Sequence, residues 1–177
     1  MKRIIAIIAW IGLVIYGLYY SVFVNPGSTF LADLFNGNAD PLAFMVFNLL
    51  GMIPLAFFLY FTQYYTLKWF HYVFLLGSFV FGGFATGAIF IWMPEEKPVQ
   101  ENKRVLIAGL IITVAVIIYG LFGSLQAYIE AFNTDTFVHV MTVDFFVLWI
   151  FYLTLPKLKN DLIQLFFLRA FSLQMLF

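Results

Sequence analysis

Long apolar runs separated by short polar segments dominate the chain. Each run is about 20 residues long, and together they cover residues 4–24, 41–61, 69–93, 105–123 and 137–155. About 20 consecutive apolar residues form a helix long enough to cross the hydrocarbon core of a membrane. Because lipid offers backbone N–H and C=O groups no partner, each run is predicted to be a helix. The pattern therefore predicts an all-α polytopic transmembrane helical bundle with five spanning helices.

The segments between these runs are too short to form a separate domain, and only residues 94–104 are strongly hydrophilic. Residues 1–177 are therefore predicted to be a single membrane domain. The tail, residues 156–177, opens with Pro156 and two lysines and then becomes apolar around Arg169. It is too short for a comfortable crossing, so it is predicted to be a short interfacial helix or a partial sixth helix.

The N-terminal run follows Lys2 and Arg3, a start that a signal peptide would share. At about 21 residues the run is longer than the apolar region of a signal peptide, and no small-residue cleavage pattern follows it. It is predicted to be a retained anchor helix. With five crossings, neither orientation gathers the basic residues on one side, and an inside N-terminus is favoured because the first helix usually dominates.

Composition supports a membrane protein, because 64% of the residues are hydrophobic and only 10% are charged. Soluble domains average about 45–50% apolar and about 25% charged residues. Lysine plus arginine equals aspartate plus glutamate at 9 each, so no basic field exists for nucleic acid. The chain has no cysteine, which excludes disulfides, thiolate metal sites and cysteine nucleophiles. The predicted location is the bacterial cytoplasmic membrane, multi-pass, with lipid as partner and a second membrane protein or a homo-oligomer as further candidates.

Asp144 is the one charged residue inside an apolar run. It lies about seven residues into its predicted helix, roughly 10 Å along the axis. An ionisable side chain at that depth is costly and usually faces a partner, a ligand or water. Two readings remain open: a proton, cation or ligand site, or a hydrogen bond between helices. For the second, Pro54 and Gly51 are predicted to form a kink in their helix, where the missing N–H of Pro54 leaves the Leu50 carbonyl as a candidate acceptor.

The other candidate polar groups are an asparagine and two histidines. Asn48, near Gly51, is a further pocket candidate but is more typical of a contact between helices. His71 and His139 each lie near the start of a predicted helix, on the same side in a five-helix arrangement. No cofactor is predicted, although two such imidazoles could ligate a b-type haem; the alternative is two interfacial histidines.

The chain contains no G-x-S-x-G, no His-Glu-x-x-His, no phosphate-loop motif and no G-x-G-x-x-G after a strand. Four glycines in the third predicted helix are predicted to form a small-residue packing seam: Gly77, Gly82, Gly83 and Gly87. His139 and Asp144 are five residues apart, about 140° around a helix, so they do not share a face. No nucleophile can be assembled with its base, which places an enzyme third among the candidate functions.

Two short stretches resemble a family of small integral membrane proteins from cyanobacteria and plastids, also found in some other bacteria. They are FNLLGMIPL at residues 47–55 and FVHVMTVDF at residues 137–145. The resemblance implies no activity, and it points to five residues: Asn48, Gly51, Pro54, His139 and Asp144. Ile53 departs from the family pattern, as does the tail. The resemblance therefore does not indicate a photosynthetic role for this chain.

Two functions follow from these observations. In the first, the protein binds or moves a small molecule or ion through a polar intramembrane pocket that includes Asp144, with His139 and Thr142 at its mouth. In the second, it is an accessory or assembly subunit of a larger membrane complex, and Asp144 is structural. The buried carboxyl group favours the first function, and the small size and aromatic richness of the chain favour the second.

Overall fold

The computed structural model describes residues 2–24, 27–98 and 103–155. Within these residues the protein is all-α, as predicted, apart from one pair of two-residue strands. The predicted C-terminal helix at residues 156–177 lies outside the described residues.

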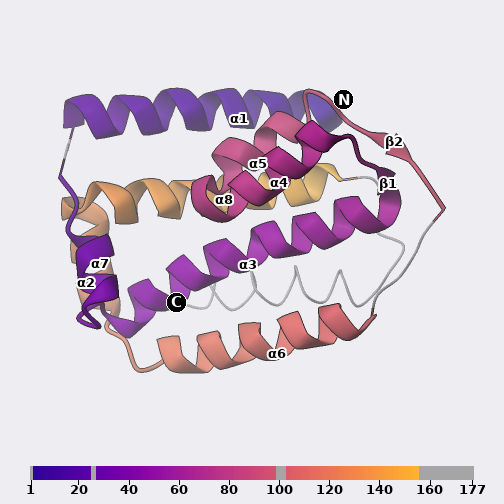
Figure 1. Ribbon diagram of the computed structural model, residues 1–177. Helices are drawn as coiled ribbons and strands as arrows, with labels where there is room; N and C mark the ends of the chain where they lie inside the picture. The colour runs from indigo at the N-terminus through magenta and orange to yellow at the C-terminus, as the bar shows by residue number, and fades with distance from the viewer. Residues whose placement is uncertain (1, 25–26, 99–102, 156–177) are drawn as a thin grey trace.

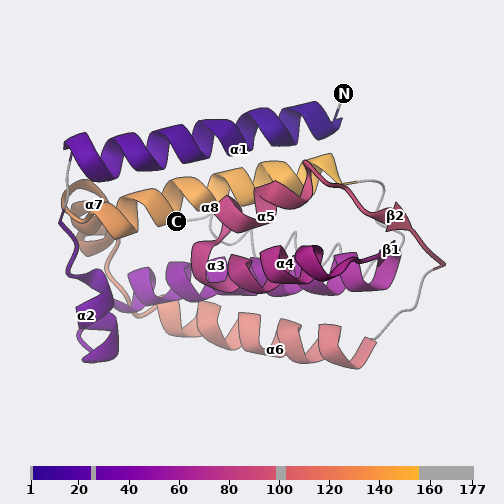
Figure 2. The same cartoon turned by 45° about the horizontal axis from the view of Figure 1, so that its top comes forward.

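The longest helices run side by side along the length of the molecule (Figures 1 and 2). They are α1 (Lys2–Tyr19), which a π-helical turn extends over Tyr20–Val24, α3 (Pro41–Tyr64), α6 (Lys103–Gly120) and α8 (Thr136–Thr154). Helix α1 packs on α8, and α3 packs on both α6 and α8. Phenylalanine rings from α3 and α8, including Phe57, Phe61 and Phe151, are fully buried in the core between them.

Each end of the bundle carries a distinct set of elements (Figure 1). Two short helices, α2 (Phe30–Phe35) and α7 (Leu125–Thr134), lie at one end, which we call the α7 end. The strands β1 (Tyr65–Thr66) and β2 (Glu95–Glu96) lie at the other end, together with the first residues of α1 and α6; we call it the ribbon end. Both short helices fall in segments that the hydropathy pattern predicts to be connections, so the pattern missed them.

Within the described residues, three helices are long and apolar enough to cross a membrane: Lys2–Val24, Pro41–Tyr64 and Thr136–Thr154. A fourth crossing is counted if Ile107–Gly120 and Leu125–Thr134, which meet at 96°, form one bent span. These helices are compatible with a membrane protein. The predicted count of five spanning helices is not confirmed.

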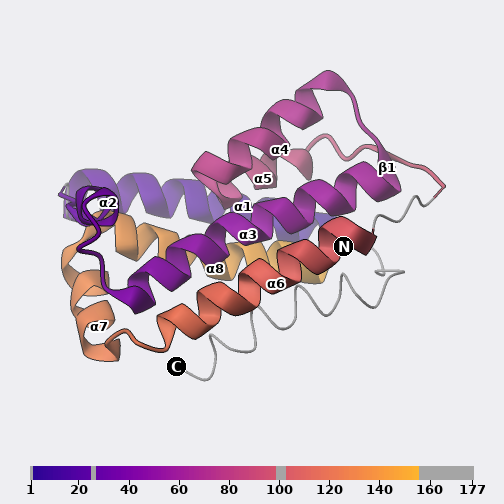
Figure 3. The ribbon, with the colours of Figure 1, turned by 60° about the horizontal axis from the view of Figure 1, so that its bottom comes forward.

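The predicted helix at residues 69–93 differs from the structure. It consists of two helices, α4 (Trp69–Phe81) and α5 (Gly83–Ile89), which pack side by side as a hairpin (Figure 3). Before the hairpin lies β1, which pairs antiparallel with β2 after it, with Tyr65 opposite Glu96. The segment therefore enters the bundle from the ribbon end and returns to the same end.

Gly82 makes the turn between the two arms of the hairpin. Its φ of 53° and ψ of −130° lie in a region that residues with a Cβ rarely adopt. The Gly82 N–H completes α4 by donating to the Ser78 carbonyl, and the Gly82 carbonyl accepts the first bond of α5 from Thr86 N–H. Hydropathy cannot distinguish this hairpin from one spanning helix, because both arms are apolar and the turn contains only glycine.

Candidate functional site

The Asp144 carboxylate lies at the turn of the α4–α5 hairpin, near the middle of α8. Its side chain is 2% exposed, and both of its oxygens accept from the Gly83 N–H, Oδ1 at 2.9 Å and Oδ2 at 3.0 Å. Gly83 begins α5, so the carboxylate lies against the end of that helix where the backbone partial charge is positive. The predicted acceptor for Asp144, the Leu50 carbonyl, is not its partner; the partner is the peptide N–H of Gly83.

Helix α5 is held at both ends by side chains from other helices. At its C-terminal end, the Arg3 guanidinium donates from Nε to the Phe90 carbonyl at 2.8 Å and from Nη2 to the Ile91 carbonyl at 2.5 Å. In its first turn, the Trp10 indole N–H donates to the Phe84 carbonyl at 2.7 Å. The positive Arg3 side chain at the C-terminal end complements the helix dipole. These contacts fix the hairpin against α1 and α8.

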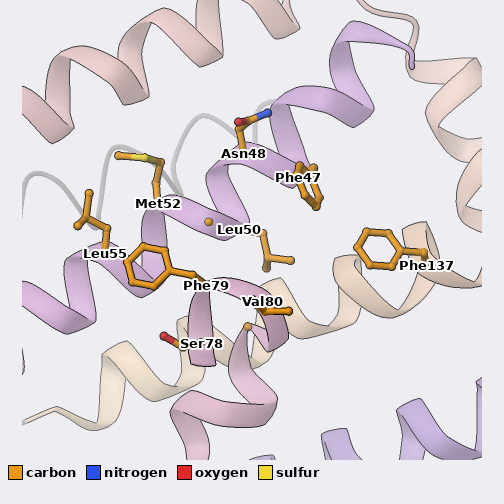
Figure 4. A pocket seen from close by; sticks show the side chains of 11 residues that line it. Phe47, Asn48, Leu50, Met52, Leu55, Ser78, Phe79, Val80 and Phe137 are labelled. Atoms are coloured by element: carbon orange, nitrogen blue, oxygen red, sulfur yellow. The ribbon is translucent and has the colours of Figure 1, made fainter. Parts of the chain in front are cut away.

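Two adjoining pockets lie beside the hairpin turn. The larger, about 290 Å³, is lined by α3, the end of α4 and Phe137 of α8 (Figure 4). The smaller, about 170 Å³, includes Asp144 and Phe84 in its lining. Both share the side chains of Leu50, Val80 and Phe137. The pockets thus place a buried carboxylate at one edge of a mainly apolar space.

Asn48 and Gly51 line the larger pocket, and Asp144 lines only the smaller one. The Asn48 amide donates to the Phe44 carbonyl one turn earlier at 2.8 Å, so one of its two N–H donors is used within its own helix. A Cβ added at Gly51 would meet no heavy atom within 4 Å. Helix α3 continues through Pro54, which is buried.

His139 lies at the α7 end and does not face either pocket. Its ring stacks on Tyr20 with centroids 3.7 Å apart and on Phe132 with centroids 4.2 Å apart. Its Nδ1 bonds to the Phe132 carbonyl at 2.9 Å and its Nε2 to the Tyr16 hydroxyl at 2.6 Å. Both ring nitrogens are therefore engaged in joining α1, α7 and α8.

Thr142 also belongs to a contact between helices. Its hydroxyl donates to the Val138 carbonyl at 2.6 Å and pairs with the Tyr128 hydroxyl of α7, also at 2.6 Å. It lines neither of the two pockets. The structure therefore does not bring His139 and Thr142 to the mouth of a pocket around Asp144.

His71 lies at the ribbon end, opposite His139. Its Nδ1 accepts from the Lys68 N–H at 2.9 Å, and its Nε2 bonds to the Trp92 carbonyl at 2.7 Å. The ring is 2% exposed and ties the start of α4 to the chain that leaves α5. The prediction that the two histidines lie on one side was wrong, because the hairpin returns to the ribbon end instead of crossing. The structure does not bring these two imidazoles together.

The predicted glycine seam is distributed over three different contacts. A Cβ at Gly82 or Gly83 would overlap the Asp144 carboxylate, and a Cβ at Gly87 would overlap the Trp10 ring. A Cβ at Gly77 would meet only the Ala85 methyl, at an ordinary 3.6 Å. Gly82, Gly83 and Gly87 thus permit the close approach of α8 and α1 to the hairpin.

Asp135 is a hydrogen-bonded carboxylate that the sequence analysis missed. As the N-cap of α8, its carboxylate accepts from the Phe137 and Val138 N–H groups. It also accepts from the Ser28 hydroxyl and from the Thr29 and Phe30 N–H groups, at 2.8–3.0 Å. Burial alone would raise its pKa, but these hydrogen bonds hold the pKa of Asp135 below its usual value. An acidic residue just before an apolar run is a helix-start signal that could have identified it.

Comparison of the chain with models of known families, with curated proteins and with solved structures found no match in any of the three. The resemblance at residues 47–55 and 137–145 therefore remains a prediction from short motifs.

Proposed function

We propose that the protein binds a small, mainly apolar molecule dissolved in the membrane, in the pockets beside the α4–α5 hairpin. The observation that carries this proposal is the larger pocket, about 290 Å³, at the middle of α3. Ligand sites are commonly concave, lined mostly by apolar side chains, with a few polar groups that orient the ligand. The pocket has this character.

The lining of the pocket supports an apolar ligand over an ion. Most of its side chains are aromatic or aliphatic, among them Phe47, Met52, Leu55 and Phe79. The Asp144 carboxylate, which a cation would need, already accepts from a peptide N–H and lies at the edge of the smaller pocket. An ion would gain few oxygen ligands here, whereas a hydrocarbon body with one polar group would fit both the lining and the edge.

The position of the pocket supports entry from the lipid. Val80 and Phe79 line the pocket and are 76% and 44% exposed, so the pocket opens at the side of the bundle. Leu50 and Gly51 lie near the middle of a 24-residue helix, about 15 Å from its start at 1.5 Å per residue. In a membrane that α3 spans, this is the depth of the lipid tails, where apolar molecules concentrate.

Filling the pocket tests the proposal. Gly51→Leu places a side chain in open pocket space, and Gly12→Leu, where an added Cβ also meets nothing, is the matched control on the exposed side of α1. The full chain in lipid nanodiscs is irradiated with an octanol that carries a diazirine, and labelled residues are mapped by mass spectrometry. We expect saturable labelling near Met52 and Phe79 that falls at least fivefold in Gly51→Leu and is unchanged in Gly12→Leu.

Non-saturable labelling spread evenly over the lipid-exposed residues of α1 and α6 would contradict the proposal. So would equal labelling of Met52 and Phe79 in the two variants. Thermal unfolding of both variants shows that neither result comes from loss of the fold.

A further inference from the structure

The hairpin changes how charge is distributed over the molecule. Because β1 and β2 pair, the segments on either side of the hairpin lie at the same end. Every lysine and arginine in the described part of the chain then falls at the ribbon end, within two residues of a strand or in the first turn of α1 or α6. They are Lys2, Arg3, Lys68, Lys97, Lys103 and Arg104. Two acidic residues, Glu95 and Glu96, accompany them.

The α7 end has the opposite character. Its charged residues, within the described ranges, are all acidic: Asp33, Asp40, Glu130 and Asp135. Two of these cap helices, since Asp40 accepts from Leu42 N–H at the start of α3 and Asp135 caps α8. The two ends of the bundle thus differ in sign.

Two exposed tryptophans lie at the ribbon end. Trp69 and Trp92 lie at the outer ends of the two hairpin arms and are 78% and 52% exposed. Tryptophan concentrates where lipid tails meet headgroups. Trp69 and Trp92 therefore have the exposure expected of side chains at headgroup level.

We propose that the ribbon end is the cytosolic face of the protein. Lysine and arginine are enriched in the cytosolic segments of membrane proteins, whereas aspartate and glutamate have little influence on orientation. The two short strands, and the ends of the two hairpin arms next to them, then face the cytosol. The α7 end faces the opposite side.

The absence of cysteine makes this orientation directly measurable, because each introduced cysteine is the only thiol. Thr66→Cys and Pro98→Cys report on the ribbon end, before and after the hairpin, and Asn36→Cys and Gln126→Cys report on the α7 end. All four positions are exposed and uncharged, so the substitutions leave the charge distribution intact. Gly12→Cys, on the lipid-facing side of α1, is the control for a thiol within the membrane.

Each variant of the full chain is expressed in a bacterial inner membrane and treated with a membrane-impermeant maleimide, on spheroplasts and after lysis. We expect Asn36→Cys and Gln126→Cys to be labelled on intact spheroplasts, Thr66→Cys and Pro98→Cys only after lysis, and Gly12→Cys in neither. Labelling of the ribbon-end pair on intact spheroplasts overturns the orientation. Labelling of Thr66→Cys and Pro98→Cys from different sides overturns the hairpin topology on which the orientation depends. Neither result bears on the pocket labelling, so the two proposals fail separately.

Discussion

Gly82 combines two constraints that no other residue type satisfies. Its positive φ belongs to a region in which a Cβ is strained, and a Cβ there would also overlap the Asp144 carboxylate. Backbone strain of this kind costs about 1–3 kcal/mol at a single position. Gly82→Ala is therefore expected to lower the free energy of unfolding by at least this amount, measured in detergent.

Gly77→Ala is the matched control for Gly82→Ala. Gly77 lies within α4, where an added methyl meets only the Ala85 methyl at 3.6 Å. Alanine has a higher helix propensity than glycine by about 1 kcal/mol, so this variant should be as stable as the native chain or more stable. Equal destabilisation by the two substitutions would show that the hairpin turn carries no special constraint.

Two substitutions at Asp144 distinguish the effect of its hydrogen bond to Gly83 from the effect of its charge. Asp144→Leu leaves the buried Gly83 N–H without an acceptor, which costs about 1–3 kcal/mol. Asp144→Asn keeps a carbonyl oxygen for the same N–H, so its loss of stability should be clearly smaller. Thermal unfolding of the two variants makes the comparison. If asparagine is as damaging as leucine, the negative charge and not the hydrogen bond stabilises the hairpin.

Among the elements, the cap of α8 has the clearest dependence on pH. The hydrogen bonds to Asp135 lower its pKa, so the ionised carboxylate stabilises the folded state. That contribution is complete above the unfolded pKa, near the usual 3.8, and is lost as the pH falls through the lower folded pKa. Asp135→Ala should lose about 1–2 kcal/mol at pH 7, as typical for an N-cap, and the difference from the native chain should shrink below pH 3.8.

Glu130→Ala is the control for that measurement. Glu130 is exposed on α7, close to Asp135 in the chain, and is not the cap of a helix. Its removal should change the unfolding temperature little at either pH. A difference between native chain and Asp135→Ala that stays constant from pH 7 to pH 3 would contradict the stabilising role of the ionised carboxylate.

The elements also show where hydropathy stops being informative. Helices α3 and α8 follow the predicted runs closely, because a long apolar run has no stable alternative to a helix in lipid. The run at 69–93 has the same composition, yet Gly82 lets it fold back, and backbone conformation at one glycine leaves no trace in a hydropathy profile. The amphipathic α7 lacks the length of a span, so a search for apolar runs passes over it.

At the scale of the whole molecule, the hairpin decides which residues share an end. The prediction that His71 and His139 lie on the same side, and the ambiguous distribution of lysine and arginine, both followed from treating residues 69–93 as a crossing. The sequence contains Asp144 and Gly83 at 61 residues' separation, and no local pattern relates them. Their contact depends on the three-dimensional path of the hairpin. Asp144 could therefore be singled out from the sequence, but its partner Gly83 could not.

A disulfide across the base of the hairpin tests that path. Thr66 lies opposite Glu95 in the antiparallel pair, where Cα atoms are about 4.5–5.5 Å apart. This spacing lies within the range that a disulfide accepts. The double variant Thr66→Cys and Glu95→Cys should therefore form an intramolecular disulfide under mild oxidation, detected as linked tryptic peptides by mass spectrometry.

The pair Asn36→Cys and Glu95→Cys, one at each end of the bundle, is the control and should not crosslink within one chain. If residues 69–93 crossed the membrane, positions 66 and 95 would lie about 30 Å apart, and the first pair would stay reduced as well.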